Sequence, residues 1–392
     1  MFKLTDERLT ELGANITTRE IEQQPQLWKE VFSNYQAKRT EIESYMASIA
    51  HKHESIRVIF TGAGTSAFVG ETVLPYLKGR VDEKKWLLST APTTDILSNP
   101  KAFFKEGIPT LLVSFARSGN SPESVAVVEL GKQLVNDLYQ LTITCAAEGK
   151  LAQNAHGDER NLLLLQPPRS NDKGFAMTSS FTCMMLMTLL VFDPLSDTDK
   201  EALVHVIALM AQAAMAQDHE IEQMMAQDFK RVIYLGSGSL ASLAREASLK
   251  ILELTAGQVA TLFDSSLGFR HGPKSFVDET SLIFVFTSND AYTRQYDLDI
   301  LNEVYAEGIA KNVYSITTMS DESFAGNQFV YPESGQSVPD GYLALPYIVF
   351  AQMISVMAAL KVANKPDTPS ATGTVNRVVQ GVVIHPVEVT KC

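Results

Sequence analysis

Cysteine is scarce in this sequence, and basic residues are outnumbered by acidic ones. Only three of its 392 residues are cysteine, and Cys145, Cys183 and Cys392 lie far apart without a Cys-x-x-Cys pair. This spacing argues against a disulfide framework or a structural zinc site and favours a reducing compartment. The formal charge of −12 argues against nucleic-acid binding, because that function needs a basic surface to displace counterions from phosphates.

Uninterrupted hydrophobic runs of membrane-spanning length are also missing, although each half closes with a long apolar helix, at 178–192 and 342–362. The most apolar run, 181–192, has 12 residues, whereas a membrane span needs about 18. Charged side chains at Lys3, Asp6 and Glu7 stand where a signal peptide has its apolar core. We therefore expect a cytoplasmic protein that is neither exported nor embedded in a membrane.

The order of the segments predicts an α/β protein. Short runs rich in β-branched and aromatic residues alternate with helical stretches, which is typical of parallel sheets covered by helices on both faces. The strand candidates of the first half are 57–61, 86–90, 110–115, 138–145 and 161–165. Before them, Thr17-Thr18-Arg19-Glu20 matches a capping box and predicts a helix start.

The second half of the sequence repeats the first. Gly236 and Gly238 lie 174 positions after Gly62 and Gly64, respectively, and both pairs follow a β-rich run. We predict two tandem three-layer αβα sandwiches with parallel sheets. The expected divisions are a helical N-terminal segment at 1–50, a first domain at 51–196, a linker helix at 197–228, a second domain at 229–364 and a C-terminal tail at 365–392.

Two glycine-containing loops follow predicted strands of the first domain. The first, Gly62-Ala63-Gly64-Thr65-Ser66, precedes a helix, and the N-terminal amides of a helix attract anions. The same glycines match a dinucleotide fingerprint. That interpretation needs an acidic residue at the end of the second strand, where Leu88-Ser89-Thr90 stands instead, so a nicotinamide site is disfavoured. A phosphate loop and a plain tight turn both stay open.

The second loop says more about ligand chemistry. Its candidate ligand side chains are Arg117, Ser118 and Ser121, arranged around a glycine. Ser121 is also placed to cap the next helix, with Pro122 in the first turn. A cap needs one hydroxyl, whereas two serines and an arginine suit a phosphate monoester. Because parallel strands end at one edge of their sheet, the two loops are expected to converge there. We favour phosphate binding over capping alone.

The second domain offers weaker catalytic candidates. On a predicted helix at 240–255, Glu246, Lys250 and Glu253 share one face. A solvated face with a Glu246–Lys250 ion pair is the competing interpretation. His271 precedes Gly-Pro in a loop, where it is either a proton carrier or a turn residue. The histidines show no metal-ligand spacing, so no metal site is expected.

These motifs resemble those of a known family. Gly62-x-Gly64-Thr65-Ser66, the stretch 117–121 and the duplicated α/β unit resemble the sugar isomerase (SIS) domain of phosphosugar-binding proteins. In the second half, Glu246-x-x-x-Lys250-x-x-Glu253 and His271-Gly272-Pro273 are similar to the isomerase half of glucosamine-6-phosphate synthase. The stretches 115–124 and 269–274 are most particular to the AgaS group of galactosamine-6-phosphate deaminase/isomerases, formerly named tagatose-6-phosphate ketose/aldose isomerases.

The resemblance implies one phosphate site, in the first domain. The residues that it assigns to phosphate binding are Thr65, Ser66, Arg117, Ser118 and Ser121, with Gly64 as a further candidate. The synthase differs at two positions of this loop, having a serine for Ala116 and a glutamine for Arg117. The matching loop of the second domain, Thr287-Ser288-Asn289-Asp290, lacks the Ser-Gly pattern and carries an acid.

The resemblance also implies catalytic residues in the second domain. Glu253 would move a proton between C1 and C2 of the sugar, His271 would assist ring opening, and Lys250 is a further candidate. The synthase has an active-site lysine in its C-terminal tail, and no lysine here aligns with it. Arg377 is the candidate replacement, which leaves the electrostatic role of that lysine open.

The implied activity is the deaminating isomerisation of galactosamine 6-phosphate to tagatose 6-phosphate and ammonia, without a cofactor. Aldose/ketose isomerisation that retains the nitrogen and a sugar-phosphate sensor without catalysis are the alternatives. The expected partner is the phosphorylated amino sugar, with no nucleic acid and no membrane. A homodimer or higher homo-oligomer is expected, and in SIS proteins the histidine commonly comes from a neighbouring subunit.

Overall fold

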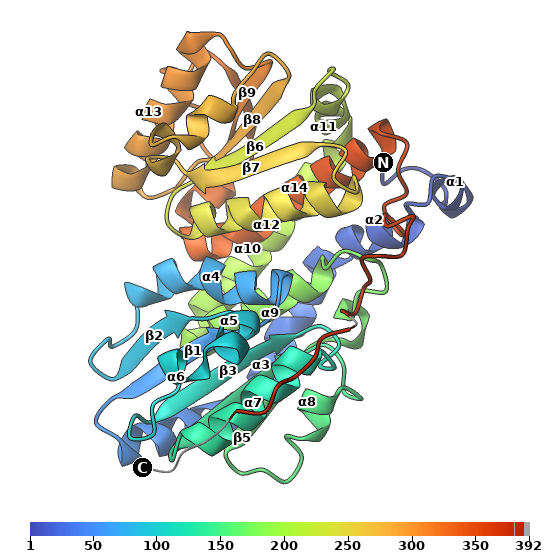
Figure 1. Ribbon diagram of the computed structural model, residues 1–392. Helices are drawn as coiled ribbons and strands as arrows, with labels where there is room; N and C mark the ends of the chain where they lie inside the picture. The colour runs from blue at the N-terminus through green and yellow to red at the C-terminus, as the bar shows by residue number, and fades with distance from the viewer. Residues whose placement is uncertain (380, 388–392) are drawn as a thin grey trace. The chain divides into compact units, whose positions relative to one another are not determined.

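The computed structural model describes residues 1–379 and 381–387, which form two compact units (Figure 1). The β1–β5 unit comprises Glu30–Asp172, Ser179–Pro194 and the chain from Val375. The β6–β10 unit comprises Met1–Lys29, Lys173–Thr178 and Leu195–Thr374. Each unit is built around one five-stranded parallel sheet.

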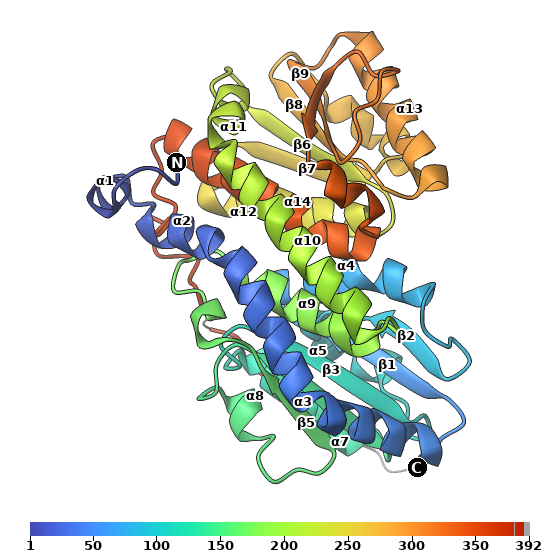
Figure 2. The same ribbon diagram turned by 180° about the vertical axis from the view of Figure 1, so that it is seen from behind.

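The sheet of the β1–β5 unit has the strand order β2-β1-β3-β4-β5. Its strands are β1 (Ile56–Thr61), β2 (Trp86–Thr90), β3 (Thr110–Ala116), β4 (Leu138–Thr144) and β5 (Asn161–Leu165). Its helices are most of α3 (Gln24–Lys52), α4 (Thr65–Lys78), α5 (Thr93–Ser98), α6 (Pro100–Phe103), α7 (Pro122–Leu134), α8 (Lys150–Gln153), the 3-10 helix η1 (Pro168–Ser170) and α9 (Ser179–Phe192). Helices α5 to α7 cover one face of this sheet, and α3 and α9 cover the other (Figures 1 and 2).

The sheet of the β6–β10 unit has the order β10-β9-β8-β6-β7, which is the same topology read from the other edge. Its strands are β6 (Arg231–Gly236), β7 (Ala260–Ser265), β8 (Ser281–Phe286), β9 (Asn312–Thr317) and β10 (Asn327–Val330). Its helices are α1 (Asp6–Glu11), α2 (Asn15–Glu22), α10 (Asp197–Ala216), α11 (Asp218–Met225), α12 (Ser239–Leu254), η2 (Gly268–Arg270), η3 (Pro273–Phe276), α13 (Ala291–Glu307), η4 (Glu333–Ser337) and α14 (Asp340–Lys361).

The registers of the two sheets match, which confirms the predicted repeat. Arg57 of β1 pairs with Leu87 and Thr110 of the flanking strands. Arg231 of β6, 174 positions later, pairs with Ala260 and Ser281 in the same manner. The predicted fold class is therefore confirmed: two α/β sandwiches with parallel sheets and a helical N-terminal segment.

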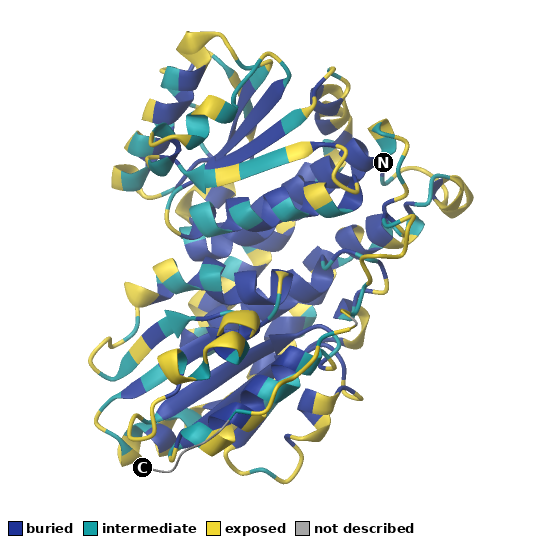
Figure 3. Cartoon of the chain, in the orientation of Figure 1, coloured by how far each residue is buried: buried dark blue, intermediate teal, exposed yellow. Residues whose placement is uncertain are grey.

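Burial explains why the central strands were readable. Every residue of β3, β4 and β8 is buried, because helices cover both faces of a parallel sheet. Strand β7 lies at an edge and is partly exposed along its length, as Figure 3 shows. Its side chains, among them Thr261 and Asp264, do not form an apolar run, so the sequence did not reveal it.

Within residues 1–379 and 381–387, one helix is long and apolar enough to cross a membrane by length and composition. It is α14, with a mean hydropathy of 2.0 over its most apolar 18 residues. Inside the β6–β10 unit, 94% of that window is buried, where α14 packs against α12 and α10. This burial is typical of a core helix in a globular protein.

The two described cysteines are free and buried. Burial raises the pKa of the Cys145 thiol to about 12 and also raises that of Cys183. Such thiols stay protonated at neutral pH and are inert as nucleophiles. Cys392 lies outside the described residues.

The predicted capping box at Thr17 is wrong. Helix α2 begins at Asn15, so Thr17 and Glu20 lie inside it. The Thr17 hydroxyl instead donates to Asp367 Oδ1 at 2.7 Å, and a Glu20 carboxylate oxygen accepts from the Gly174 amide at 3.2 Å. The sequence pattern predicted that Thr17 and Glu20 cap a helix, but both side chains instead bond residues from distant parts of the chain.

Candidate active site

The first loop joins β1 to α4 at the carboxyl edge of the β1–β5 sheet. Gly64 is the N-cap of α4 and has a φ of 56°, a left-handed conformation that favours glycine. A Cβ on Gly62 would lie 2.6 Å from the carbonyl carbon of Ser66, so a larger residue there would clash with the first turn. Thr65 and Ser66 lie in that turn and are buried. The loop therefore brings a helix N-terminus and two hydroxyl side chains to the sheet edge.

The second loop joins β3 to α7 at the same edge. Ser121 is the N-cap of α7 with Pro122 in the first turn, as predicted, yet the Ser121 hydroxyl makes no cap hydrogen bond. Ser118 and Ser121 are both partly exposed, and Ser118 Oγ accepts from the Asn120 amide at 3.3 Å. Helix capping therefore does not account for the Ser121 hydroxyl, which favours a ligand role.

The segment before α8 holds the second loop in place. The Lys150 amide donates to Asn120 Oδ1 at 3.0 Å, and the Leu151 amide donates to the Gly119 carbonyl at 3.1 Å. A Cβ on Gly149 would lie only 2.2 Å from the Ser118 carbonyl oxygen. This close packing orders the loop without a ligand, and an ordered loop would lower the entropy that any ligand binding must offset.

Arg117 contacts the C-terminal tail. Its side chain is buried, and its Nη2 donates to the Arg377 carbonyl oxygen at 2.6 Å. The Arg377 guanidinium in turn donates from Nε to the Asp172 carbonyl oxygen at 2.9 Å and from Nη2 to Asn171 Oδ1 at 3.2 Å. The tail is thus hydrogen-bonded to the second loop. Contact of Arg117 or Arg377 with a ligand stays a prediction.

Helix α12 carries a buried ion-pair triad. Lys250 Nζ lies 3.2 Å from Glu246 Oε1 and 2.6 Å from Glu253 Oε2. The side chains of Glu246 and Lys250 are 0% and 1% exposed, whereas that of Glu253 is 24% exposed. The competing interpretation of a solvated helix face is therefore wrong. Only Glu253 of the three reaches solvent, as a group that contacts a substrate must.

The two carboxylates keep Lys250 charged. Burial alone would lower the pKa of Lys250, but the charges of Glu246 and Glu253 and their hydrogen bonds raise it above the ordinary value of 10.5. The charged Lys250 thus stays an ion-pair partner of Glu253 and holds that carboxylate in place.

His271 lies in the loop between β7 and β8. The residue is exposed, and its amide donates to the Gly268 carbonyl at 2.9 Å. Gly272 follows with a φ of 124°, a conformation that glycine favours. Within the described residues no hydrogen bond to the His271 ring is formed. The backbone turn therefore accounts for Gly272 but not for the histidine side chain.

Comparison with known families identifies the repeat. The SIS domain family matches residues 52–193 and again residues 225–362, which together cover most of the chain. The chain belongs to the SIS domain family. The first SIS domain contains the two loops described above, and the second contains α12 and the His271 loop.

Individual relatives match the chain over nearly its whole length. D-galactosamine-6-phosphate deaminase AgaS of Escherichia coli is 44% identical over 373 residues, covering 94% of this chain and 95% of the relative. The AgaS protein of Shewanella sp. (strain ANA-3) is 42% identical over 383 residues, with 98% and 95% covered. The crystal structure of tagatose-6-phosphate ketose/aldose isomerase from E. coli is 40% identical, with a TM-score of 0.87 and 95% and 97% covered.

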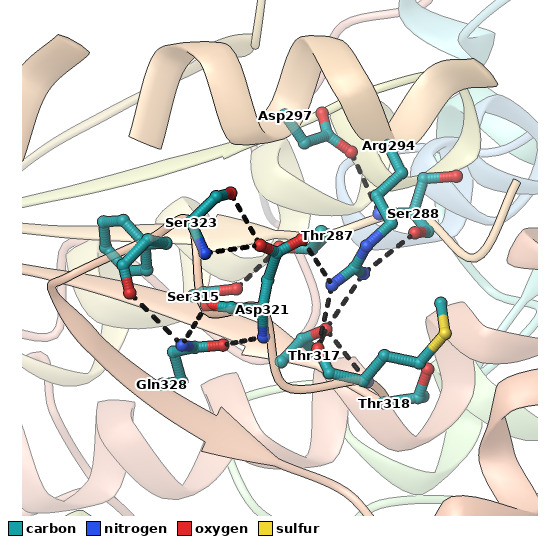
Figure 4. A network of polar contacts seen from close by, with 12 residues as sticks. Thr287, Ser288, Arg294, Asp297, Ser315, Thr317, Thr318, Asp321, Ser323 and Gln328 are labelled. Carbon is teal, nitrogen blue, oxygen red and sulfur yellow. Dashed lines mark hydrogen bonds and ion pairs between the residues drawn. The ribbon is translucent and has the colours of Figure 1, made fainter. Parts of the chain in front are cut away.

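At the carboxyl edge of the second SIS domain, the domain's own side chains form a network of hydrogen bonds, and Figure 4 shows the part of it around Ser288 and Asp297. Asp297 accepts hydrogen bonds from the Ser237 and Ser266 hydroxyls and from the Ser288 amide. Asp340 accepts from the Ser288 hydroxyl at 2.5 Å and from the Asn289 amide at 3.0 Å. Two internal carboxylates thus take up donors of this edge, which is consistent with one phosphate site per chain.

Sequence reasoning missed most of this second network. It singled out Asp290, which caps α13 by accepting from the Thr293 amide at 2.9 Å, but not Asp297 or Asp340. Asp297 lies at the seventh position of α13 and Asp340 at the first of α14. One signal in the sequence was available: an acidic residue stands at a position where the helical pattern predicts burial. Because charged residues are rarely buried without a partner, such a residue indicates a buried polar network.

Proposed function

We propose that this protein converts galactosamine 6-phosphate and water to tagatose 6-phosphate and ammonia. The observation that carries the proposal is the 44% identity over 94% of the chain to a relative named for that deamination. The Glu253–Lys250 contact at 2.6 Å supports it from the structure, because the reaction needs a carboxylate base held in place. We further propose that the protein acts in the cytoplasm and binds neither nucleic acid nor membrane.

Phosphate binding is assigned to the first SIS domain. The hydroxyls of Ser66, Ser118 and Ser121, with Thr65, would donate to the phosphate oxygens, and the amides at the helix N-termini would add further donors. Arg117 would add positive charge beside them. Binding energy from this non-reacting end of the sugar orients C1 and C2.

Proton transfer is assigned to the second SIS domain. His271 would protonate the ring oxygen and open the pyranose to the aldehyde. Glu253 would then take the proton from C2, leaving an enolamine between C1 and C2, and return a proton to C1. The product is a ketose imine, and water adds to its carbon and expels ammonia. The sugar carbonyl accepts the electron pair during the proton shuttle, so no metal or redox cofactor is expected.

Isomerisation without loss of nitrogen is the second candidate, and one relative favours it. The E. coli structure that aligns with a TM-score of 0.87 is named a ketose/aldose isomerase. Ammonia release and sugar products separate the two. The deaminase forms one ammonia for each galactosamine 6-phosphate consumed. An isomerase consumes tagatose 6-phosphate even when no ammonia is supplied, whereas a deaminase running in reverse needs ammonia as its second substrate.

A sensor role is tested by hydrogen exchange into the sugar. In deuterium oxide, an enzyme that works through Glu253 places deuterium at C1 of the product. A protein that only binds the sugar leaves all carbon-bound hydrogens in place. Deuterium incorporation that persists in Glu253→Gln would contradict the assignment of the base.

We also propose a homo-oligomer in which His271 acts on a neighbouring subunit. The exposed ring of His271, which makes no hydrogen bond within the described residues, supports this proposal. The test mixes two inactive variants, Glu253→Gln and His271→Ala, after subunit exchange. Recovery of part of the activity supports action in trans, and no recovery in verified mixed oligomers contradicts it.

A further inference from the structure

Asp297 is a buried carboxylate with three donors from three different loops. It is 0% exposed and lies on α13. Its Oδ1 accepts from the Ser237 hydroxyl at 2.6 Å and from the Ser266 hydroxyl at 2.5 Å, and its Oδ2 accepts from the Ser288 amide at 2.9 Å. Figure 4 shows the last of these contacts. The donors follow β6, β7 and β8, so one side chain joins the ends of three neighbouring strands.

Two of these loops lead to the candidate catalytic residues. Ser237 stands two residues before the start of α12, the helix that carries the Glu253 triad. Ser266 starts the loop that contains His271. The Ser266 amide also donates to the Gly236 carbonyl at 2.8 Å, so the two loops touch directly as well as through Asp297.

The first SIS domain has the same loop contact without the carboxylate. There the Thr93 amide donates to the Gly62 carbonyl at 2.7 Å, which matches the Ser266–Gly236 bond. The position of Ser237 is taken by Ala63, which has no hydroxyl. The fold therefore forms without a carboxylate that links these two loops. Such a carboxylate, Asp297, occurs in the domain that carries Glu253 and His271.

Retaining a charge at this position is unfavourable for stability. Burial raises the pKa of Asp297 above its ordinary value of 3.8, and the nearby Asp340 raises it further, although the three donors oppose the shift. An uncharged side chain of similar size would avoid this desolvation. Features that are unfavourable for stability are often retained for function.

We propose that Asp297 is a positioning residue for the reaction, fixing the start of α12 and the His271 loop relative to each other. The inference rests on the proposed function for its catalytic consequence. Asp297 is fully buried and does not itself contact the substrate. Its two short bonds to serine hydroxyls hold the loops in one arrangement, and small displacements of catalytic groups lower turnover strongly.

The experiment uses Asp297→Asn, Ser237→Ala and Ser266→Ala in the full chain. For each we expect kcat for ammonia release to fall by about tenfold or more. KM should stay within about twofold, because phosphate binding belongs to the other domain. Ser237→Thr keeps the hydroxyl and should restore turnover to near the wild-type value. Ser355→Ala is the matched control, because this buried serine of the same domain donates to the Ala351 carbonyl of its own helix at 2.7 Å and contacts neither loop. It should leave kcat unchanged.

Hydrogen–deuterium exchange gives a readout that does not depend on the activity. In Ser237→Ala and Ser266→Ala we expect faster amide exchange at 266–276 and in the first turn of α12, with unchanged exchange in β8. An inactive wild-type protein would overturn the proposed function, while faster exchange in the variants would still support the loop coupling. Unchanged kcat and unchanged exchange in both serine variants would overturn the inference, even if Asp297→Asn fails to fold.

Discussion

The two SIS domains share a topology but differ at the carboxyl edges of their sheets. In the first domain, Ser118 and Ser121 are partly exposed, and the Ser121 hydroxyl is not used by the helix cap. In the second domain, Asp297 and Asp340 occupy the hydroxyl and amide donors of that edge. Donors that already bond internal carboxylates are less available to an anionic ligand. Duplication of one fold has thus produced one edge that we propose binds phosphate and one edge whose donors bond internal carboxylates.

The largest expected effect comes from breaking the ion-pair triad of the second domain. Lys250→Met leaves the fully buried Glu246 without its cation, and removing one partner of a buried pair costs about 3–5 kcal/mol. We expect the free energy of unfolding to fall by that amount in urea titrations. Lys132→Met, which removes an exposed i,i+3 pair with Glu129, should change it by less than about 0.5 kcal/mol. A loss in Lys250→Met as small as that of the control would contradict the account.

The next effect is on turnover. Glu253→Gln removes the proposed base but keeps the shape of the side chain, so kcat should fall by at least about 10²-fold. KM should change little, because the phosphate loops are untouched. Steady-state ammonia release measures both constants. Glu43→Gln on the exposed side of α3 is the control. Normal turnover in Glu253→Gln would show that another residue is the base.

Substitutions in the proposed phosphate-binding loop of the first domain should affect KM more than kcat, the opposite of Glu253→Gln. Ser118→Ala and Ser121→Ala should each raise KM about tenfold, because a hydrogen bond to a charged group is worth about 1.5–3 kcal/mol. Their kcat should fall less than that of Glu253→Gln. The corresponding test in the second domain is Ser237→Ala, which should leave KM unchanged. Equal effects on KM in both domains would remove the distinction between the two edges.

The smallest effect is on the pH dependence of stability. The pKa of Asp297 is raised in the folded state, mainly by burial, so the folded protein binds this proton more tightly than the unfolded chain. The resulting stabilisation is present below about pH 3.8 and is lost as the pH rises through the folded pKa. Asp297→Asn removes this term. The variant should therefore gain stability relative to wild type in urea titrations as the pH rises above about 4. A stability difference that does not change with pH would contradict the raised pKa.

Much of the fold was readable from the sequence because parallel strands are apolar on both faces. The predicted runs at 86–90 and 161–165 coincide with β2 and β5. The predicted helix at 240–255 differs from α12 by one residue at each end. The repeat was predicted from the spacing of 174 residues between the two glycine pairs, since each pair marks the turn from a strand into a helix.

The rest depended on tertiary contacts that no local pattern contains. The face of Glu246 and Lys250 looked solvated, because the sequence does not reveal that α14 covers α12. The loop residues Ser118 and Ser121 could be placed at a sheet edge, but not the tail contact from Arg117 to Arg377. Asp297 meets its donors only when the ends of three strands come together, and those donors lie up to 60 positions away in the chain.

The central claim is tested most directly by measuring ammonia release from galactosamine 6-phosphate by the purified wild-type protein. Glucosamine 6-phosphate and N-acetylgalactosamine 6-phosphate serve as parallel substrates. The account predicts one ammonia and one tagatose 6-phosphate for each galactosamine 6-phosphate consumed, with slower or no release from the other two. Consumption of galactosamine 6-phosphate without ammonia, or no consumption at all, would contradict it.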